Sequence, residues 1–214
     1  MSGFRQAKMT ERSNSTVAYY DGTPESYLQE LLGVDAEPLY RPFLALIPSG
    51  GSILDLGCGP GRDTKVFLGR GYQVTAVDAS SRMVEAATRL SGQQVQQLAV
   101  EELDIESAFD GVWACASLIH VPRRGLADAI RRIRRALRPG GVCYMSFKEG
   151  VGERIDATGR HFTDFTPIEL EAFLTTEIGL ELIKLWSSED LRLERTQRWA
   201  NALVRDCSSA AVSS

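Results

Sequence analysis

Three glycines at alternate positions, Gly57, Gly59 and Gly61, follow a short apolar run at residues 53–56. Apolar residues return after them at the spacing of a helix, so the sequence predicts a strand, a tight glycine turn and a helix. Glycine lets the backbone turn sharply and lets a ligand approach the main chain. The first N–H groups of the helix would point at that ligand. The turn is therefore a candidate site for a nucleotide-like ligand.

The residues around the turn indicate the charge of the ligand. The spacing is Gly-x-Gly-x-Gly, whereas dinucleotide-binding folds use Gly-x-Gly-x-x-Gly. Asp55 stands just before the first glycine, and a carboxylate there repels a pyrophosphate and suits a cation. S-adenosylmethionine (SAM) carries a sulfonium and an ammonium group and no phosphate. The pattern therefore favours SAM over a nicotinamide dinucleotide.

Residues 53–61, Ile-Leu-Asp-Leu-Gly-Cys-Gly-Pro-Gly, resemble the first motif of the class I SAM-dependent methyltransferases. The resemblance implies a Rossmann-like α/β fold, a three-layer sandwich around a seven-stranded, mostly parallel sheet with an antiparallel C-terminal strand. It also implies SAM as methyl donor, with S-adenosylhomocysteine as the product. The motif residues that would contact SAM are Asp55, Gly57, Cys58, Gly59 and Gly61.

A second acid stands where an acid holds ribose hydroxyls in related folds. Residues 71–78 read as a strand that ends in Asp78, about 20 residues beyond the turn. Ser80 can then cap a helix. The junction resembles the methyltransferase form, which implies that Asp78 binds the ribose, Ala79 adjoins it and Met83 packs against adenine. A methionine at this helical spacing can equally be a core residue.

Two further strand ends carry candidates. Residues 95–100 read as a third strand, and the family resemblance implies that Glu101 or Glu102 accepts a hydrogen bond from adenine. Residues 109–122 carry a second family signature, Phe-Asp-x-Val followed by Leu-x-His. Ala116 is expected to line the methyl-transfer channel, because strand ends face the ligand crevice in open α/β sheets. His120 is a candidate general base, with a structural or SAM-proximal role as the alternative.

The N-terminal segment is expected to cover the site. Residues 1–14 are polar and predict a mobile tail, and residues 15–48 predict a helical lid. Residues 20–27 resemble a family motif, which implies that Tyr20 and Tyr27 approach the sulfonium methyl, where a cation–π contact is favourable. The alternative is a surface helix that buries its tyrosines. Arg41 is a candidate for the SAM carboxylate or an ordinary surface arginine.

The segments after Phe147 vary in this fold and are expected to specify the acceptor. Residues 148–153 read as a polar loop, a helix is expected after Thr166, and the last two strands are expected at 180–186 and 198–204. Candidates for binding a polar or anionic acceptor are Tyr20, His120, Lys148, Arg160, His161 and Asp164. Residues 159–204 also resemble small bacterial methyltransferases grouped with the tellurite-resistance methyltransferase.

No residue stands out as catalytic, and His120 and Lys148 are the candidates. The methyl carbon of a sulfonium is already electrophilic, so in-line displacement needs alignment more than acid–base groups. The prediction is methyl transfer from SAM to a small-molecule acceptor. A SAM- or nucleotide-binding protein without turnover and an RNA methyltransferase are the alternatives.

Composition limits the class of protein. A chain of 214 residues predicts one main domain, here residues 49–206, with a disordered tail at 207–214. The net charge of −4 and a pI near 5.3 argue against nucleic acid as the default partner. No apolar run approaches the ~18 residues needed to cross a membrane, and no signal region is seen. A cytoplasmic protein is expected, as a monomer or homodimer. No metal site is expected, because the four cysteines lie far apart in the sequence.

Overall fold

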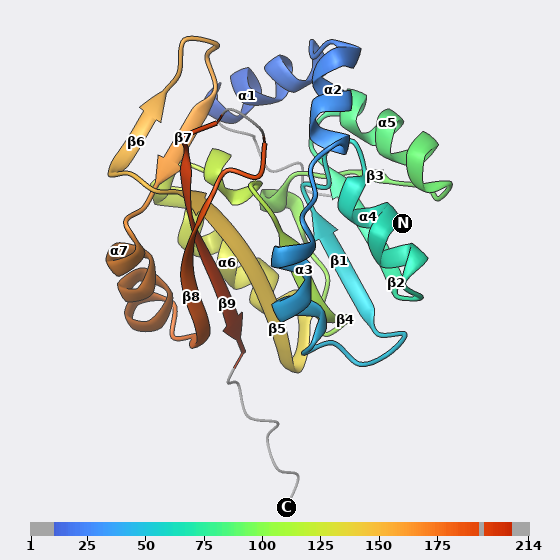
Figure 1. The fold of residues 1–214 in the computed structure, drawn as a ribbon. Helices are drawn as coiled ribbons and strands as arrows, with labels where there is room; N and C mark the ends of the chain where they lie inside the picture. Colours follow the sequence, from blue (N-terminus) through green and yellow to red (C-terminus); the bar gives the residue numbers. More distant parts are fainter. Residues whose placement is uncertain (1–10, 193–194, 207–214) are drawn as a thin grey trace, which may run out of the picture.

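A seven-stranded sheet forms the centre of the computed structural model, which describes residues 11–192 and 195–206. Its strand order is β3-β2-β1-β4-β5-β9-β8 (Figure 1). The strands are β1 (Ser52–Leu56), β2 (Gln73–Asp78), β3 (Gln96–Gln97), β4 (Phe109–Ala114), β5 (Leu137–Lys148), β8 (Glu181–Glu189) and β9 (Arg198–Arg205). Strand β9 is antiparallel to both neighbours, and the pairs from β3 to β5 are parallel. This confirms the predicted fold class.

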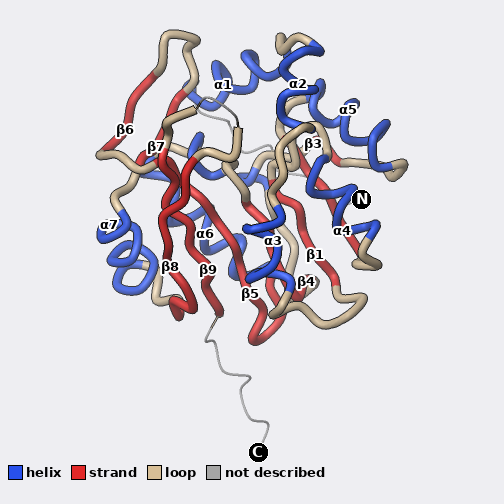
Figure 2. The backbone as a smooth tube through the Cα atoms, viewed as in Figure 1, coloured by secondary structure: helices blue, strands red, loops and turns tan. Residues whose placement is uncertain are grey.

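Helices cover both faces of the sheet (Figure 2). One face carries α3 (Glu37–Leu44), α4 (Arg62–Gly69) and α5 (Ser81–Ser91), and the other carries α6 (Arg123–Ala136) and α7 (Pro167–Ala172). Short turns complete the layers: η1 (Val100–Glu102), η2 (Leu118–His120) and η3 (Phe173–Glu177). Alternation along β1 explains the two layers, because Leu54 packs in the α6 cluster while Ile53 packs in the α3 cluster.

The core beneath α3 and α4 is a group of aromatic rings. Trp113 is fully buried and stacks on Tyr144, with ring centroids 4.1 Å apart. Its indole Nε1 donates to Asp63 at 2.7 Å, so the polar edge of this large ring has a buried partner. Tyr40 and Phe43 of α3 pack against the same rings. Helix α3 is therefore part of the core, although it falls within the predicted lid.

Helices α1 (Glu11–Asp21) and α2 (Glu25–Leu32) lie across the carboxyl ends of the parallel strands (Figure 1). Helix α1 begins at Glu11, so part of the predicted tail at residues 1–14 is helical. Residues 1–10 and the tail predicted at 207–214 lie outside the described residues. In the part of the chain that the structure describes, no helix combines the length and the apolar character needed to cross a bilayer.

A β-hairpin corrects the prediction of a polar loop after β5. Strands β6 (Gly152–Ile155) and β7 (His161–Asp164) form a separate two-stranded antiparallel sheet. All residues of β6 are exposed, so its sequence lacks the apolar alternation that signals a half-buried strand. The ion pair between Arg154 and Asp164, at 2.6 Å, joins the two strands.

Gly61 has a packing role, and its contact with the ligand stays a prediction. It has φ +92° and does not line the cavity described below. A Cβ atom at this position would lie 2.8 Å from the Cα of Ala87 in α5. Glycine is therefore needed for α4 to start this close to α5.

We expect Gly61→Ala to lower the free energy of unfolding by about 3 kcal/mol, through left-handed strain and overpacking against Ala87. The control is Gly92→Ala, because Gly92 also has positive φ but its Cβ would meet no atom within 4 Å. It should cost about 1 kcal/mol from strain alone. Urea unfolding measures both variants, and equal losses would contradict the packing role.

Candidate active site

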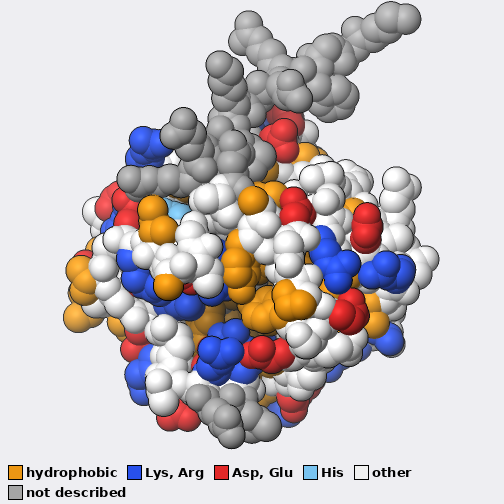
Figure 3. Space-filling model, turned by 90° about the horizontal axis from the view of Figure 1, so that it is seen from above, with side chains coloured by type: hydrophobic (Ala, Val, Ile, Leu, Met, Phe, Trp, Pro, Cys, Tyr) orange, Lys and Arg blue, Asp and Glu red, His pale blue; other side chains and the backbone are white. Residues whose placement is uncertain are grey.

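A cavity of about 300 Å³ opens at the carboxyl ends of the parallel strands, beneath α1 and α2. Its walls come from the turns after β1, β2 and β4, from the end of β5 and from the N-terminal helices. Figure 3, which views this face, shows apolar and basic side chains together around its centre. The cavity therefore lies at the sheet edge where open α/β folds bind their ligands.

The glycine turn forms one wall of the cavity through Gly57, Cys58 and Gly59. A Cβ atom on Gly57 would lie 2.4 Å from the Cβ of Ser117, so this glycine lets the turn approach the loop after β4. A Cβ on Gly59 would meet no atom within 4 Å. Because Gly59 lines the cavity, a ligand can approach its backbone directly.

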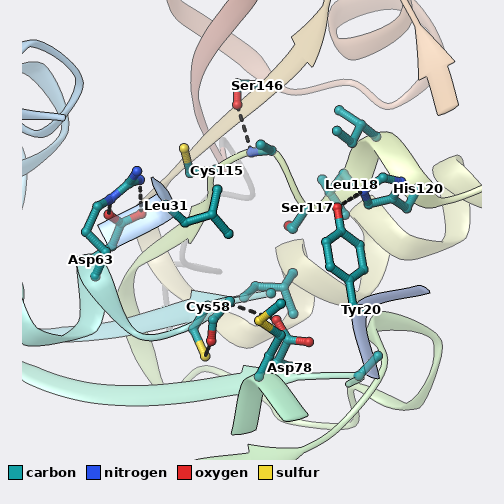
Figure 4. Close-up of a pocket in the computed structure, with 18 of the residues that line it drawn as sticks. Tyr20, Leu31, Cys58, Asp63, Asp78, Cys115, Ser117, Leu118, His120 and Ser146 are labelled. Carbon is teal, nitrogen blue, oxygen red and sulfur yellow. Dashed lines mark hydrogen bonds and ion pairs between the residues drawn. The ribbon is translucent and has the colours of Figure 1, made fainter. Parts of the chain in front are cut away.

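Asp78 lies beside the glycine turn and is held from two directions (Figure 4). Its Oδ2 accepts the Gly59 N–H at 2.8 Å, and its Oδ1 accepts the Ser80 N–H at 2.9 Å. Burial raises the pKa of this carboxyl to about 6, although the two backbone donors act in the opposite direction. Each oxygen keeps a lone pair, so the carboxylate can accept two neighbouring hydroxyl groups.

The structure distinguishes the two glutamates that the sequence left equal. Glu101 lines the cavity, as do Ala79 and Met83. Glu102 does not, because its carboxylate accepts the N–H of Ala99 at 3.2 Å and caps the η1 turn. Met83 is also a core residue, only 2% exposed, and its packing against adenine stays a prediction.

Asp55 is buried behind the turn and does not line the cavity, and its contact with the ligand stays a prediction. The alternation of β1 directs it to the same face as Ile53, beneath α4. Its Oδ2 accepts the hydroxyl of Thr64 at 2.5 Å. Burial and the charge of Asp63 hold its pKa well above the usual range. Asp55 thus joins β1 to α4.

Arg62 is the arginine near the glycine turn that reaches the cavity, and the sequence analysis missed it. It pairs with Asp63 at 2.5 Å, and Asp63 also accepts from Tyr40 and Trp113. Arg41 is exposed on α3 and does not line the cavity, which favours its interpretation as a surface residue. The signal for Arg62 was its place as the first residue of α4.

Helix α1 contacts the elements around the cavity through two adjacent residues, Tyr20 and Asp21. Tyr20 lines the cavity, and its hydroxyl lies 2.9 Å from Nε2 of His120 (Figure 4). Asp21 accepts a hydrogen bond from the hydroxyl of Ser80 at 2.7 Å. Tyr27 of α2 also lines the cavity. Both predicted tyrosines therefore face the site.

His120 is a neutral imidazole with both nitrogens engaged. Its Nδ1 lies 2.7 Å from the backbone carbonyl oxygen of His161, which only accepts, so Nδ1 carries the proton. Its Nε2 then accepts from the hydroxyl of Tyr20. Burial, with a smaller contribution from the charges of Arg160 and Lys148, lowers its pKa to about 4. Such an imidazole is a weak base at neutral pH, which does not support the general-base role.

The acceptor candidates divide into two groups. Lys148 and Arg160 line the cavity, whereas His161 and Asp164 do not, and acceptor binding by any of the four stays a prediction. His161 is 1% exposed, with Nε2 lying 3.0 Å from Glu153, and Asp164 pairs with Arg154. Several other lining residues were not expected at the site: Cys115, Tyr144, Ser146, Trp199 and Asn201.

The cavity residues fit a ligand that carries ribose hydroxyls. Ser117 Oγ lines the cavity and is buried without a hydrogen-bond partner among the described residues. A buried polar atom of this kind costs free energy unless a ligand or water completes it. Together with the open side of Gly59 and the two free acceptor positions of Asp78, it fits the predicted cofactor.

Comparisons with known proteins agree with this geometry. Residues 53–141 match the family model described as a methyltransferase domain. The ubiquinone biosynthesis O-methyltransferase of Xanthomonas axonopodis pv. citri (strain 306) is 34% identical over 205 residues, which cover 85% of this chain and 83% of that protein. A malonyl-[acyl-carrier protein] O-methyltransferase of Enterobacter lignolyticus (strain SCF1) is 37% identical over 92 residues, which cover 42% of this chain and 36% of that protein.

The fold has a similar solved counterpart in the 1,6-didemethyltoxoflavin-N1-methyltransferase of Burkholderia thailandensis, a structure with bound S-adenosylhomocysteine. The TM-score is 0.74 at 24% identity, and the match covers 94% of this chain and 93% of that chain. The chain belongs to the class I SAM-dependent methyltransferases. It transfers a methyl group from SAM to a small-molecule acceptor. The resemblance to the tellurite-resistance group stays a prediction.

We expect the affinity for SAM to fall about tenfold between pH 7 and pH 5, because only the ionised form of Asp78 accepts two hydroxyls and its pKa is about 6. His120, with a pKa of about 4, stays neutral over this range. Calorimetric titration at several pH values measures the effect. Asp78→Asn should bind weakly at every pH, and an unchanged pH dependence in this variant would contradict the assignment.

Proposed function

We propose that this methyltransferase acts on an oxygen atom of its small-molecule acceptor. The observation that carries the proposal is that one cavity contains both the glycine turn with Asp78 and a second wall with Tyr20, His120 and Lys148. A donor and an acceptor can therefore lie next to each other in it. The names of the Xanthomonas and Enterobacter relatives, both O-methyltransferases, support oxygen as the acceptor atom.

We propose a role for each residue on the donor side of the cavity. Asp78 would accept the ribose hydroxyls, Glu101 would accept from the adenine amine, and Met83 would pack against the adenine ring. Arg62 would bind the carboxylate of SAM, which is the role first expected for Arg41. The backbone of Gly57 and Gly59 would border the amino acid part. When bound, SAM supplies an electrophilic methyl group on a sulfonium.

The N-terminal helices would act as a lid. Thr16, Val17 and Tyr20 line the cavity from α1, so this helix covers part of the site. A closed lid excludes water and aligns the acceptor, which is the main requirement of an in-line displacement. His120 fixes the direction of the Tyr20 hydroxyl through its own fixed tautomer. Its low pKa indicates an acceptor that needs no strong base.

The remaining expectations concern location and assembly. We propose a cytoplasmic enzyme that acts as a monomer or homodimer. Cys58, Cys115 and Cys143 are free thiols, which is typical of a reducing compartment. A cavity of about 300 Å³ suits a small acceptor better than a nucleic acid.

The test is methyl transfer to a panel of phenols and catechols, measured by S-adenosylhomocysteine release and by NMR detection of the new O-methyl signal. Gly59→Leu should abolish turnover, because its side chain enters the cavity. Gly71→Leu is the control, since Gly71 also has positive φ and open space but does not line the cavity. Tight SAM binding with no product from any acceptor would overturn the function in favour of a binding protein.

Arg62→Gln should weaken S-adenosylhomocysteine binding by about tenfold or more, because a charge-assisted hydrogen bond is lost. Arg41→Gln, the same change on the exposed surface of α3, should leave the affinity unchanged. Calorimetry measures binding, and thermal unfolding checks that the pairing of Asp63 with Tyr40 and Trp113 still holds the fold. Equal affinities of the two variants for S-adenosylhomocysteine would contradict the role proposed for Arg62.

A further inference from the structure

We propose that the methyl acceptor carries a negative charge, as a carboxylate or an ionised hydroxyl, and that Lys148 binds it with Arg160 and Arg192 at its sides. The inference rests on the proposed function, because it describes the acceptor half of the same cavity. All three residues line that cavity. The argument depends on which cations already have partners.

The arginines around Lys148 each have a carboxylate partner. The pairs are Arg154 with Asp164 at 2.6 Å, Arg160 with Asp156 at 2.8 Å, and Arg192 with Asp190 at 2.6 Å. Within each pair, the positive charge of the arginine is balanced by the negative charge of the aspartate. The charge of Lys148 has no such partner, since its ammonium group makes no ion pair or hydrogen bond within residues 11–192 and 195–206.

Lys148 occupies a position where an unpaired charge is costly. It is the last residue of β5 and is half-buried, with Nζ 3.9 Å from the centroid of the Phe162 ring. Burial, together with the charges of Arg154, Arg160 and Arg192, lowers its pKa to about 8, although the charge of Asp164 acts in the opposite direction. Desolvated cations in proteins are normally paired. An anion from the ligand would complete this site.

The acids near the cavity do not supply that anion. Asp190 and Asp63 each pair with the arginine beside them. Glu189 lines the cavity but is exposed to solvent, where its charge is screened. Glu149, the next residue after Lys148, pairs with Arg198 at 3.0 Å.

The cationic group lies on the acceptor side of the cavity, away from the ribose site. Asp78 ends β2 and Lys148 ends β5, and the order β2-β1-β4-β5 places three strand spacings between them. At the usual spacing this is roughly 14 Å. The distance leaves room for the reacting methyl group between the two sites.

The walls near this group also limit the acceptor's shape. Tyr144, Phe162 and Trp199 line the cavity with aromatic surface. An apolar or aromatic body with one anionic group would match both the rings and Lys148. A matched pair of aromatic ligands that differ only in charge therefore provides the sharpest test.

The experiment measures ligand binding to the full chain by calorimetry, with and without S-adenosylhomocysteine. The probes are para-hydroxybenzoate against para-hydroxybenzamide, and salicylate against salicylamide. A third arm uses para-nitrophenol, whose ionised form is visible by its absorbance, to distinguish an ionised hydroxyl from a carboxylate. We expect at least one anion to bind about tenfold more tightly than its neutral counterpart.

Three variants assign the preference to Lys148. Lys148→Met should abolish the preference for the anion, and Lys148→Arg should keep it, because arginine retains the charge. Lys65→Met, the same change on the exposed face of α4, is the control and should behave as the native protein. Turnover by Lys148→Arg also argues against a base, since arginine stays protonated.

The proposal is overturned if no anion in the panel binds more tightly than its neutral partner, or if Lys148→Met keeps the preference. Affinity for S-adenosylhomocysteine is measured separately in every variant. If the native chain does not bind S-adenosylhomocysteine, the proposed function is refuted. If the native chain binds it but shows no preference for anions, only this inference is refuted.

Discussion

The hydrogen bond from the Gly59 amide to the Asp78 carboxylate is the interaction on which the cofactor half of the cavity depends. It joins the turn after β1 to the end of β2, and it requires Gly59 to adopt φ +56°. Ser80 donates to the other carboxylate oxygen, so Asp78 is fixed between a turn and the start of a helix. The burial that raises its pKa also strengthens any hydrogen bond that it accepts from a ligand.

The parts of the site that were predictable from sequence are those built from neighbouring residues. The glycine turn, Asp78 and Met83 each lie at a junction of strand and helix, where the local pattern sets the position. Asp55 could not be placed in this way. Its direction depends on the alternation of β1 and on which helix covers that face, and α4 provides Thr64 as its partner. The direction of an arginine is equally a matter of packing, which is why Arg62 was missed.

The acceptor side was less predictable because its elements lack strong periodicity. Strand β6 is exposed along its whole length and pairs only with β7. The sequence therefore gave no apolar signal for the hairpin. Once the hairpin forms, His161 and Asp164 are buried and make their contacts within the hairpin itself. Arg160, just before β7, remains at the cavity. The side chains that reach the ligand follow from this pairing.

The charges on the two sides of the cavity are opposite in sign, and this bears on the chemistry. The donor side presents the carboxylates of Asp78 and Glu101, while the acceptor side presents Lys148 and Arg160. Transfer of a methyl group from a cation to an anion removes both charges. Water stabilises separated charges, so a cavity partly covered by Tyr20 favours a reaction that neutralises them. A neutral imidazole at His120 suits the same surroundings, because it adds no charge between the two sides.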